Sequence, residues 1–187
     1  MRTATAADAD AIAALHADSW RRFYRGAYSD DFLDGDVIGD RLTVWRARLE
    51  RALTPTETTV AEDETRLLGF GHIVFDDDPR WGALLDNLHV VHDAHRRGIG
   101  TRLLVHIARA VVERPGQTGL YLWVLEQNTS AQAFYRSHGA AFAERAPVSP
   151  PGGIPSRVNG TPVKSRYVWS AEALGALSRI VVDRSDS

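Results

Sequence analysis

One stretch of this 187-residue chain decides the fold: His95-Arg96-Arg97-Gly98-Ile99-Gly100-Thr101-Arg102-Leu103-Leu104. It follows a strand-like apolar run at 84–91 and leads into a helix-like apolar run at 103–111. The first turn of a helix has unpaired backbone N–H groups and the positive end of the helix dipole. Glycines there let an anion approach the backbone, while the arginines and Thr101 add charge and a hydroxyl. The sequence therefore predicts a ligand that carries phosphates.

This glycine loop fits neither of two common nucleotide loops. The dinucleotide fingerprint G-x-G-x-x-G accommodates Gly98 and Gly100, but Leu103 stands where its third glycine belongs. That fingerprint also needs an acidic residue about 20 positions further on, and Glu126 comes too late. The Walker loop needs glycine-lysine followed by serine or threonine, which the stretch lacks. A third type of phosphate loop is required.

A second motif follows the apolar strand-like run at 120–125. It has the pattern N-x-x-A-x-x-F-Y-x-x-x-G, formed by Asn128, Ala131, Phe134, Tyr135 and Gly139. Together the two motifs resemble the GCN5-related N-acetyltransferase (GNAT) superfamily, whose phosphate loop is R/Q-x-x-G-x-G/A. The loop here departs from that pattern at His95, which changes one side-chain contact and leaves the backbone cradle intact. The resemblance is close over residues 84–142 and extends elsewhere by the order of elements.

The resemblance implies an α/β (α+β) fold with a mixed central sheet, a splayed pair of strands and flanking helices. It implies acetyl-coenzyme A as the acyl donor, no metal, and direct transfer to an amine acceptor, a small molecule or a peptide. The pantetheine arm would pair with the strand before the glycine loop, where N–H groups around His89 and Val90 would polarise the thioester. The implied cofactor-binding residues are Leu88, His89, Val90, His95, Arg96, Arg97, Gly98, Ile99, Gly100, Thr101, Asn128, Phe134 and Tyr135.

Tyr135 is the predicted general acid, because it stands at the family's Phe-Tyr position near the expected thiol sulfur. The alternative role of Tyr135 is structural, as an aromatic side chain that only packs with Phe134. The general base stays open between Asp86, His89 and a water relay. Asp86 and His89 would face opposite sides of a regular strand, but a bulge, frequent beside active sites, would change this. Asn128 is expected to cap the following helix and to contact the cofactor, with a Thr129–Gln132 capping box as the alternative.

Composition limits the classes of function. At 44% apolar residues the chain can bury a sizeable core, and a net charge of −2 predicts no general affinity for nucleic acid. The absence of cysteine excludes disulfides, thiolate metal sites and a cysteine nucleophile. The sequence shows neither a signal-peptide pattern nor an apolar run near 18 residues, so we expect a cytoplasmic protein without a membrane partner. Four alternatives stay open: another acyl-coenzyme A, an O-acceptor, a non-catalytic coenzyme A-binding module and a nucleotide-binding switch.

The pattern predicts a single domain at 1–182 and a disordered tail at 183–187. A Pro/Gly-rich arm at 146–164 either covers the acceptor side or makes a homodimer contact. Residues 20–28 predict a packing helix or aromatics that line an acceptor pocket. Acidic residues at 30–36 and 76–78 either attract a cationic amine or form a solvated face. The expected strands are 2–5, 58–62, 66–75, 84–91, 120–125, 140–145 and 165–170, and the expected helices are 8–20, 41–53, 103–111, 129–138 and 171–182.

Overall fold

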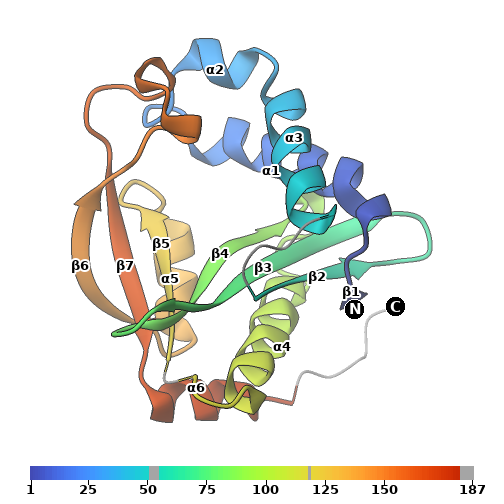
Figure 1. The fold of residues 1–187 in the computed structure, drawn as a ribbon, viewed down its shortest axis with the longest axis vertical. Coiled ribbons are helices and arrows are strands. Elements are labelled where there is room, and N and C mark those ends of the chain that lie inside the picture. The colour runs from blue at the N-terminus through green and yellow to red at the C-terminus, as the bar shows by residue number, and fades with distance from the viewer. Residues whose placement is uncertain (51–54, 118, 182–187) are drawn as a thin grey trace.

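The computed structural model describes residues 1–50, 55–117 and 119–181, which form one seven-stranded sheet flanked by helices (Figure 1). The strand order is β1-β2-β3-β4-β5-β7-β6, and β4–β5 is the parallel pair within an otherwise antiparallel sheet. The predicted fold class is confirmed. The strands are β1 (Arg2–Thr3), β2 (Thr56–Glu62), β3 (Leu67–Asp78), β4 (Gly82–Val90), β5 (Leu120–Leu125), β6 (Ala141–Pro147) and β7 (Val163–Trp169).

The two central strands separate soon after they begin to pair. Among the described residues their ladder consists of Ala83 opposite Leu120 and Leu84 opposite Tyr121. β4 then continues to Val90 and β5 to Leu125, while β5 stays paired with β7 along its whole length. The predicted splay is therefore present. It leaves an unpaired edge on β4 and another on β5, and these two edges face a common cleft.

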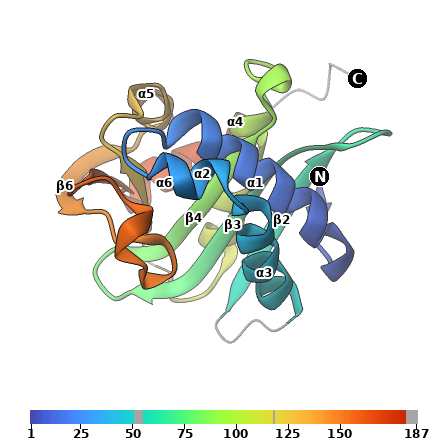
Figure 2. The same cartoon turned by 90° about the horizontal axis from the view of Figure 1, so that it is seen from above.

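The helices cover both faces of the sheet and hold the two strand edges apart. α1 and α3 lie over one face of β2–β4 and α4 lies over the other (Figures 1 and 2). Trp45 and Phe70 are fully buried under α1 and α3, and Leu104 and Ile107 of α4 pack on the opposite face. Each such side chain stabilises the fold by roughly 1.5–3 kcal/mol. The helices are α1 (Ala9–Phe23), α2 (Asp30–Asp34), α3 (Val37–Glu50), α4 (Ile99–Glu113), α5 (Thr129–Ser137) and α6 (Ala171–Ser178).

Three local predictions were wrong. Residues 20–28 form no second helix, because α1 continues to Phe23 and the chain then turns at Gly26, whose φ is +86°. Residues 30–40, whose acidic residues and two glycines predict a loop, are instead occupied by α2 and the start of α3. β3 does not stop before the acidic turn, because a register irregularity with Asp76 at φ +54° lets the strand run on to Asp78. The predicted helix segment at 51–53 and the predicted tail at 183–187 lie outside the described residues.

The arm at 146–164 folds back onto the segment that joins α1 to α3. Val158 bridges to Tyr28, and the Asn159 N–H donates to the Ala27 carbonyl at 2.9 Å. Arg157 pairs with Asp40 at 2.7 Å. These contacts brace the arm over the end of the sheet where β4 and β5 diverge, as Figure 1 shows. The arm therefore closes one side of the cleft region.

Candidate active site

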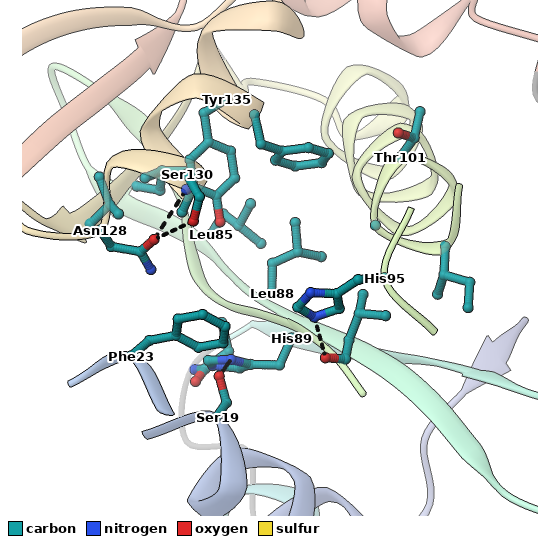
Figure 3. A pocket seen from close by; sticks show the side chains of 18 of the residues that line it. Ser19, Phe23, Leu85, Leu88, His89, His95, Thr101, Asn128, Ser130 and Tyr135 are labelled. Carbon is teal, nitrogen blue, oxygen red and sulfur yellow. Dashed lines mark hydrogen bonds between the residues drawn. The ribbon is translucent and has the colours of Figure 1, made fainter. Parts of the chain in front are cut away.

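A large cavity of about 660 Å³ lies between the separated ends of β4 and β5. Figure 3 shows Tyr135 and Asn128 on the side of α5, and Ser19 and Phe23 entering from α1. Arg97 is exposed and does not line the large cavity, so its role stays a prediction. The other residues predicted to bind the cofactor all line it: Leu88, His89, Val90, His95, Arg96, Gly98, Ile99, Gly100, Thr101, Asn128, Phe134 and Tyr135.

The glycine loop ends in an open helix N-terminus. Gly98 caps α4 in the left-handed region with φ +73°, which a residue with a Cβ adopts only with strain. No described atom lies within 4 Å of the position that such a Cβ would take. The cap makes no side-chain hydrogen bond and the first turn of α4 contains no acidic residue. Its N–H groups and dipole are therefore available to an anion.

His95 turns away from this helix terminus. Its Nε2 lies 3.0 Å from the Val90 carbonyl oxygen, and because a carbonyl only accepts, Nε2 carries the proton. The ring also stacks on Phe23 with centroids 6.3 Å apart. The one residue that departs from the family's loop pattern thus binds the end of β4 and leaves the anion site to the backbone.

The open edge of β4 presents alternate N–H groups to the cleft. The Val91 N–H donates to the Leu68 carbonyl at 2.9 Å, and the register makes His89–Phe70 the next hydrogen-bonded pair. The His89 N–H therefore points to β3, whereas those of Leu88 and Val90 point into the cleft. This corrects the prediction that both His89 and Val90 would present their N–H groups to a ligand. Leu88 and Val90 are the available donors.

Tyr135 is almost fully buried on α5, and its hydroxyl makes no hydrogen bond to the described residues. Burial raises the pKa of this hydroxyl above its usual value, and nearby Tyr24 adds to the effect. Asn128 fixes the start of α5, because its Oδ1 accepts from the Ala131 N–H at 3.1 Å. The predicted N-cap is confirmed, and Gln132 instead donates to the Glu126 carbonyl at 2.7 Å. Tyr135 thus offers the cavity an unpaired proton donor.

Asp86 is the extra residue of a bulge in β4. His72 pairs with Asn87 and Ile73 pairs with Leu85, which leaves Asp86 without a partner on β3. The bulge anticipated from the sequence is therefore present. Asp86 lines the large cavity and also a small cavity of about 410 Å³ under α1 and α3. Its carboxylate forms an ion pair with Arg48 at 2.8 Å.

His89 belongs to a buried group of aromatic side chains below α1. Its Nδ1 lies 2.8 Å from the Ser19 hydroxyl, and its ring lies 4.7 Å from that of His16. His16 accepts a hydrogen bond from Trp45 Nε1 at 3.0 Å. Burial lowers the pKa of His89 to about 4, and that of His16 falls well below its usual value. Both rings are therefore neutral at physiological pH.

The buried histidines predict a loss of stability in mild acid. Burial lowers the pKa of His72, as of His89, to about 4, against about 6.5 in an unfolded chain. The unfolded state therefore binds more protons between these values, so the free energy of unfolding is full above about pH 6.5 and falls towards pH 4. Each histidine contributes on the order of a few kcal/mol. Urea unfolding followed by tryptophan fluorescence at pH 7.5 and 5.0 measures the change.

The matched variants for this prediction are His72→Gln and His106→Gln. The His106 side chain is 44% exposed on α4 and lies 3.6 Å from Glu57, so His106→Gln controls for the loss of a surface histidine. His72→Gln should reduce the difference in unfolding free energy between the two pH values. Equal pH dependence in wild type and His72→Gln would contradict the assignment. Asp8, whose pKa is held at about 2 by Arg2, acts below this window.

Several other residues that complete the wall of the large cavity had no predicted site role, among them Ser19, Leu122, Val124, Ser130 and His138. Phe23 and Tyr24 also line it, and the sequence indicated them only as part of the aromatic run at 20–28. Tyr24 lines both cavities, and burial raises its pKa to about 12. The aromatic run at 20–28 was the available signal. Trp20, Tyr24 and Tyr28 of this run line the small cavity, and their role towards an acceptor stays a prediction.

No three His, Cys, Asp or Glu side chains in the described ranges are grouped so that they could hold a metal ion. The described helices include none with the length and apolar character needed to span a bilayer.

The chain matches the acetyltransferase (GNAT) family over residues 12–140, and it belongs to that family. It is 26% identical over 141 residues to the uncharacterised N-acetyltransferase YuaI of Bacillus subtilis strain 168, covering 74% of this chain and 78% of that protein. The PaiA N-acetyltransferase of Thermoplasma acidophilum, solved with coenzyme A, superposes with a TM-score of 0.66 at 18% identity over 88% and 95% of the two chains. NAA60 of Arabidopsis thaliana, solved with a bisubstrate analogue, superposes with a TM-score of 0.65 at 17% identity. The match covers 90% of this chain and 95% of that chain.

Proposed function

We propose that this chain transfers the acetyl group of acetyl-coenzyme A directly to an amine within a ternary complex. One observation carries the proposal: a single cavity joins the open helix terminus at Gly98 to the unpaired hydroxyl of Tyr135. Membership of the acetyltransferase family supports it, as does the coenzyme A in the similar PaiA structure. The chain has no cysteine, so no cysteine thiol can carry the acetyl group, which agrees with direct transfer.

The proposed donor would lie along the cavity from α4 to α5. Its diphosphate would bind the first turn of α4, with Arg96 and Thr101 beside it. Its amide-rich arm would pair with the open edge of β4, where the Leu88 and Val90 N–H groups are unpaired with β3. Its thioester would then lie towards Tyr135. The open edge of β4 thus orients the donor before the reaction begins.

In the proposed reaction, the amine nitrogen attacks the thioester carbonyl carbon and the C–S bond breaks. The electron pair of that bond leaves on sulfur as a thiolate. The Tyr135 hydroxyl donates its proton to the sulfur as the bond breaks, and the tyrosine regains a proton from solvent after product release. The raised pKa suits this role, because the hydroxyl stays protonated at working pH. The same apolar surroundings raise the proton affinity of the departing thiolate.

We propose Asp86 as the group that receives the amine proton, directly or through a water. Asp86 lines both the large and the small cavity, so it stands between the two reactants. His89 lines the large cavity but not the small one, and its Nδ1 is hydrogen-bonded to the Ser19 hydroxyl. The bulge at Asp86 is the structural reason for this difference.

The Asp86→Asn variant tests the base. We expect kcat at neutral pH to fall about 100-fold, the scale of general base catalysis. The loss should shrink as pH rises towards the pKa of the acceptor, because more of the amine is then already free of its proton. A pH–rate profile for Asp86→Asn and His89→Gln makes the comparison. A loss that is equal at every pH would mean that Asp86 only anchors Arg48.

The function itself is tested with a panel of amines, polyamines, aminoglycosides, amino acids and peptides. Thiol release from acetyl-coenzyme A would be followed, and the acetylated product would be identified by mass. We expect release that depends on the acceptor. Tight coenzyme A binding with no product from any acceptor would instead identify a non-catalytic binding module. A preference for a donor with a longer acyl chain would change the identity of the transferred group and leave the proposed transfer reaction in place.

A further inference from the structure

The small cavity has a composition that bears on the acceptor. It shares six described residues with the large cavity, five of them on the splayed strands and one at the end of α1: Leu85, Asp86, Asn87, Trp123, Val124 and Tyr24. Its remaining wall comes from α1, Tyr28, α3, β4, β5, β7 and the start of the arm, at Val148 and Ser149. A molecule in the small cavity would therefore meet the donor at Asp86. This is the place for the acceptor if the proposed function holds.

Among the charged residues described in the lining of the small cavity, cations outnumber carboxylates. Arg41, Arg48 and Lys164 line it, and Asp86 is the sole carboxylate among the described lining residues. His16 also lines it, and burial keeps that ring neutral at physiological pH. Arg48 shares its charge with Asp86 at 2.8 Å, and Arg41 pairs with Asp40 at 2.5 Å. Lys164 is the remaining cation of this lining, and it forms no ion pair with the described residues.

Lys164 is the only lysine in the chain, against 21 arginines. It faces the small cavity from β7 and lies over the Trp123 ring, with Nζ 4.6 Å from the ring centroid. Its ammonium group makes no hydrogen bond or ion pair with the described residues. Burial lowers its pKa and Arg166 adds to this, while the Asp86 carboxylate acts in the opposite direction without cancelling the shift. A half-buried cation with no carboxylate in contact is costly unless an anion completes the site.

The acidic runs seen in the sequence do not offset this charge. Asp30 and Asp34 pair with Arg25, and Asp76 pairs with Arg114. None of them lines the small cavity. They therefore present no carboxylate to a molecule in the small cavity.

We propose that the acceptor is an amine that also carries an anionic group, a carboxylate or a phosphate, bound by Lys164. This rests on the proposed function and specifies its substrate class. The amine would lie at Asp86, beside the splay, and the anionic group would lie at Lys164 on β7. The aromatic rings of Trp20, Tyr24, Tyr28 and Trp123 form the uncharged part of the wall.

Matched acceptors test the proposal. Amino acids would be compared with their amides, and aminoalkyl phosphates with the corresponding amino alcohols. We expect kcat/KM to be about 10- to 100-fold higher for the anionic member of a pair, the range of one charge-assisted hydrogen bond. The two pairs distinguish a carboxylate from a phosphate. Higher kcat/KM for the neutral members would overturn the proposal.

The Lys164→Gln variant assigns the effect to this site. It should raise KM for the anionic acceptor about 10-fold or more and leave KM for the neutral partner and coenzyme A affinity unchanged. Arg46→Gln is the control, because that exposed arginine lies on α3 and does not line the small cavity. Equal losses in both variants, or no loss in Lys164→Gln, would contradict the role of Lys164. Acetylation of no amine at all would refute the proposed function, whereas acetylation without anionic preference would refute this inference alone.

Labelling of the single lysine gives a readout that does not need turnover. A lysine-directed reagent modifies Lys164 and the α-amino group, and peptide mass spectrometry separates the two sites. An anionic acceptor should slow modification of Lys164, and its amide should not. Equal protection by both compounds would show that occupancy of the cavity does not require the anion.

Discussion

Replacing Tyr135 with phenylalanine should lower kcat by about 100-fold or more, since positioned proton donors contribute 10²–10⁴-fold. The hydroxyl lies in the large cavity without a hydrogen bond to the described residues, so its removal deletes no internal contact. Coenzyme A affinity and the melting temperature should therefore stay near those of the wild type. Single-turnover transfer to a good acceptor, together with a binding titration, measures both quantities.

Tyr167→Phe is the matched control for this variant. Tyr167 lies in the same buried cluster as Tyr135 but on β7, and it does not line the large cavity. Its hydroxyl donates to Gln132 at 3.1 Å, so the control removes a real hydrogen bond of the same kind of side chain. We expect little change in kcat there. Unchanged turnover in Tyr135→Phe would leave Tyr135 as a packing residue and pass the acid role to another group.

Replacing Gly98 with aspartate should weaken coenzyme A binding by at least tenfold relative to Gly98→Asn. Both residues tolerate the left-handed φ of +73° better than other side chains, and they are nearly equal in size. They differ in charge, which in the aspartate would occupy the anion site at the first turn of α4 and repel a diphosphate. The difference between the two affinities should shrink as salt is raised, because screening weakens the repulsion. Calorimetric titration at two ionic strengths measures it.

Gly116 supplies the control pair for the loop variants. It also has a positive φ, +83°, and no described atom lies within 4 Å of the position of a Cβ, but it does not line the large cavity. Gly116→Asp and Gly116→Asn should bind coenzyme A equally well. If Gly98→Asp binds as tightly as Gly98→Asn, the phosphates do not lie at this helix terminus.

The parts of the site that sequence could predict are those fixed by local backbone chemistry. Gly98 before an apolar helix and Asn128 at a strand–helix junction predict a helix terminus and a cap, and both are present. The apolar runs at 84–91 and 120–125 likewise located β4 and β5. The splay could be anticipated only through resemblance, since neither strand contains a signal that says where pairing stops.

The small cavity, where we propose that the acceptor binds, could not be predicted from local patterns, because it is assembled from distant segments. Arg48, Lys164 and Tyr24 come from α3, β7 and the end of α1, and only the folded chain brings them around Asp86. The direction of the backbone N–H groups along β4 depends on the register of β4 with β3. This register shows that the N–H groups of Leu88 and Val90 face the cleft and that the N–H group of His89 does not. The packing of the arm against residues 27–40 depends on tertiary contacts in the same way.

Tracing an isotope-labelled acetyl group tests the central claim most directly. The protein would be mixed with labelled acetyl-coenzyme A, first alone and then with an amino acid acceptor, and all species would be weighed by mass spectrometry. We predict no labelled protein in the first mixture, and in the second equal amounts of N-acetylated acceptor and free coenzyme A. Label that accumulates on the protein and then moves to the acceptor would contradict direct transfer within a ternary complex.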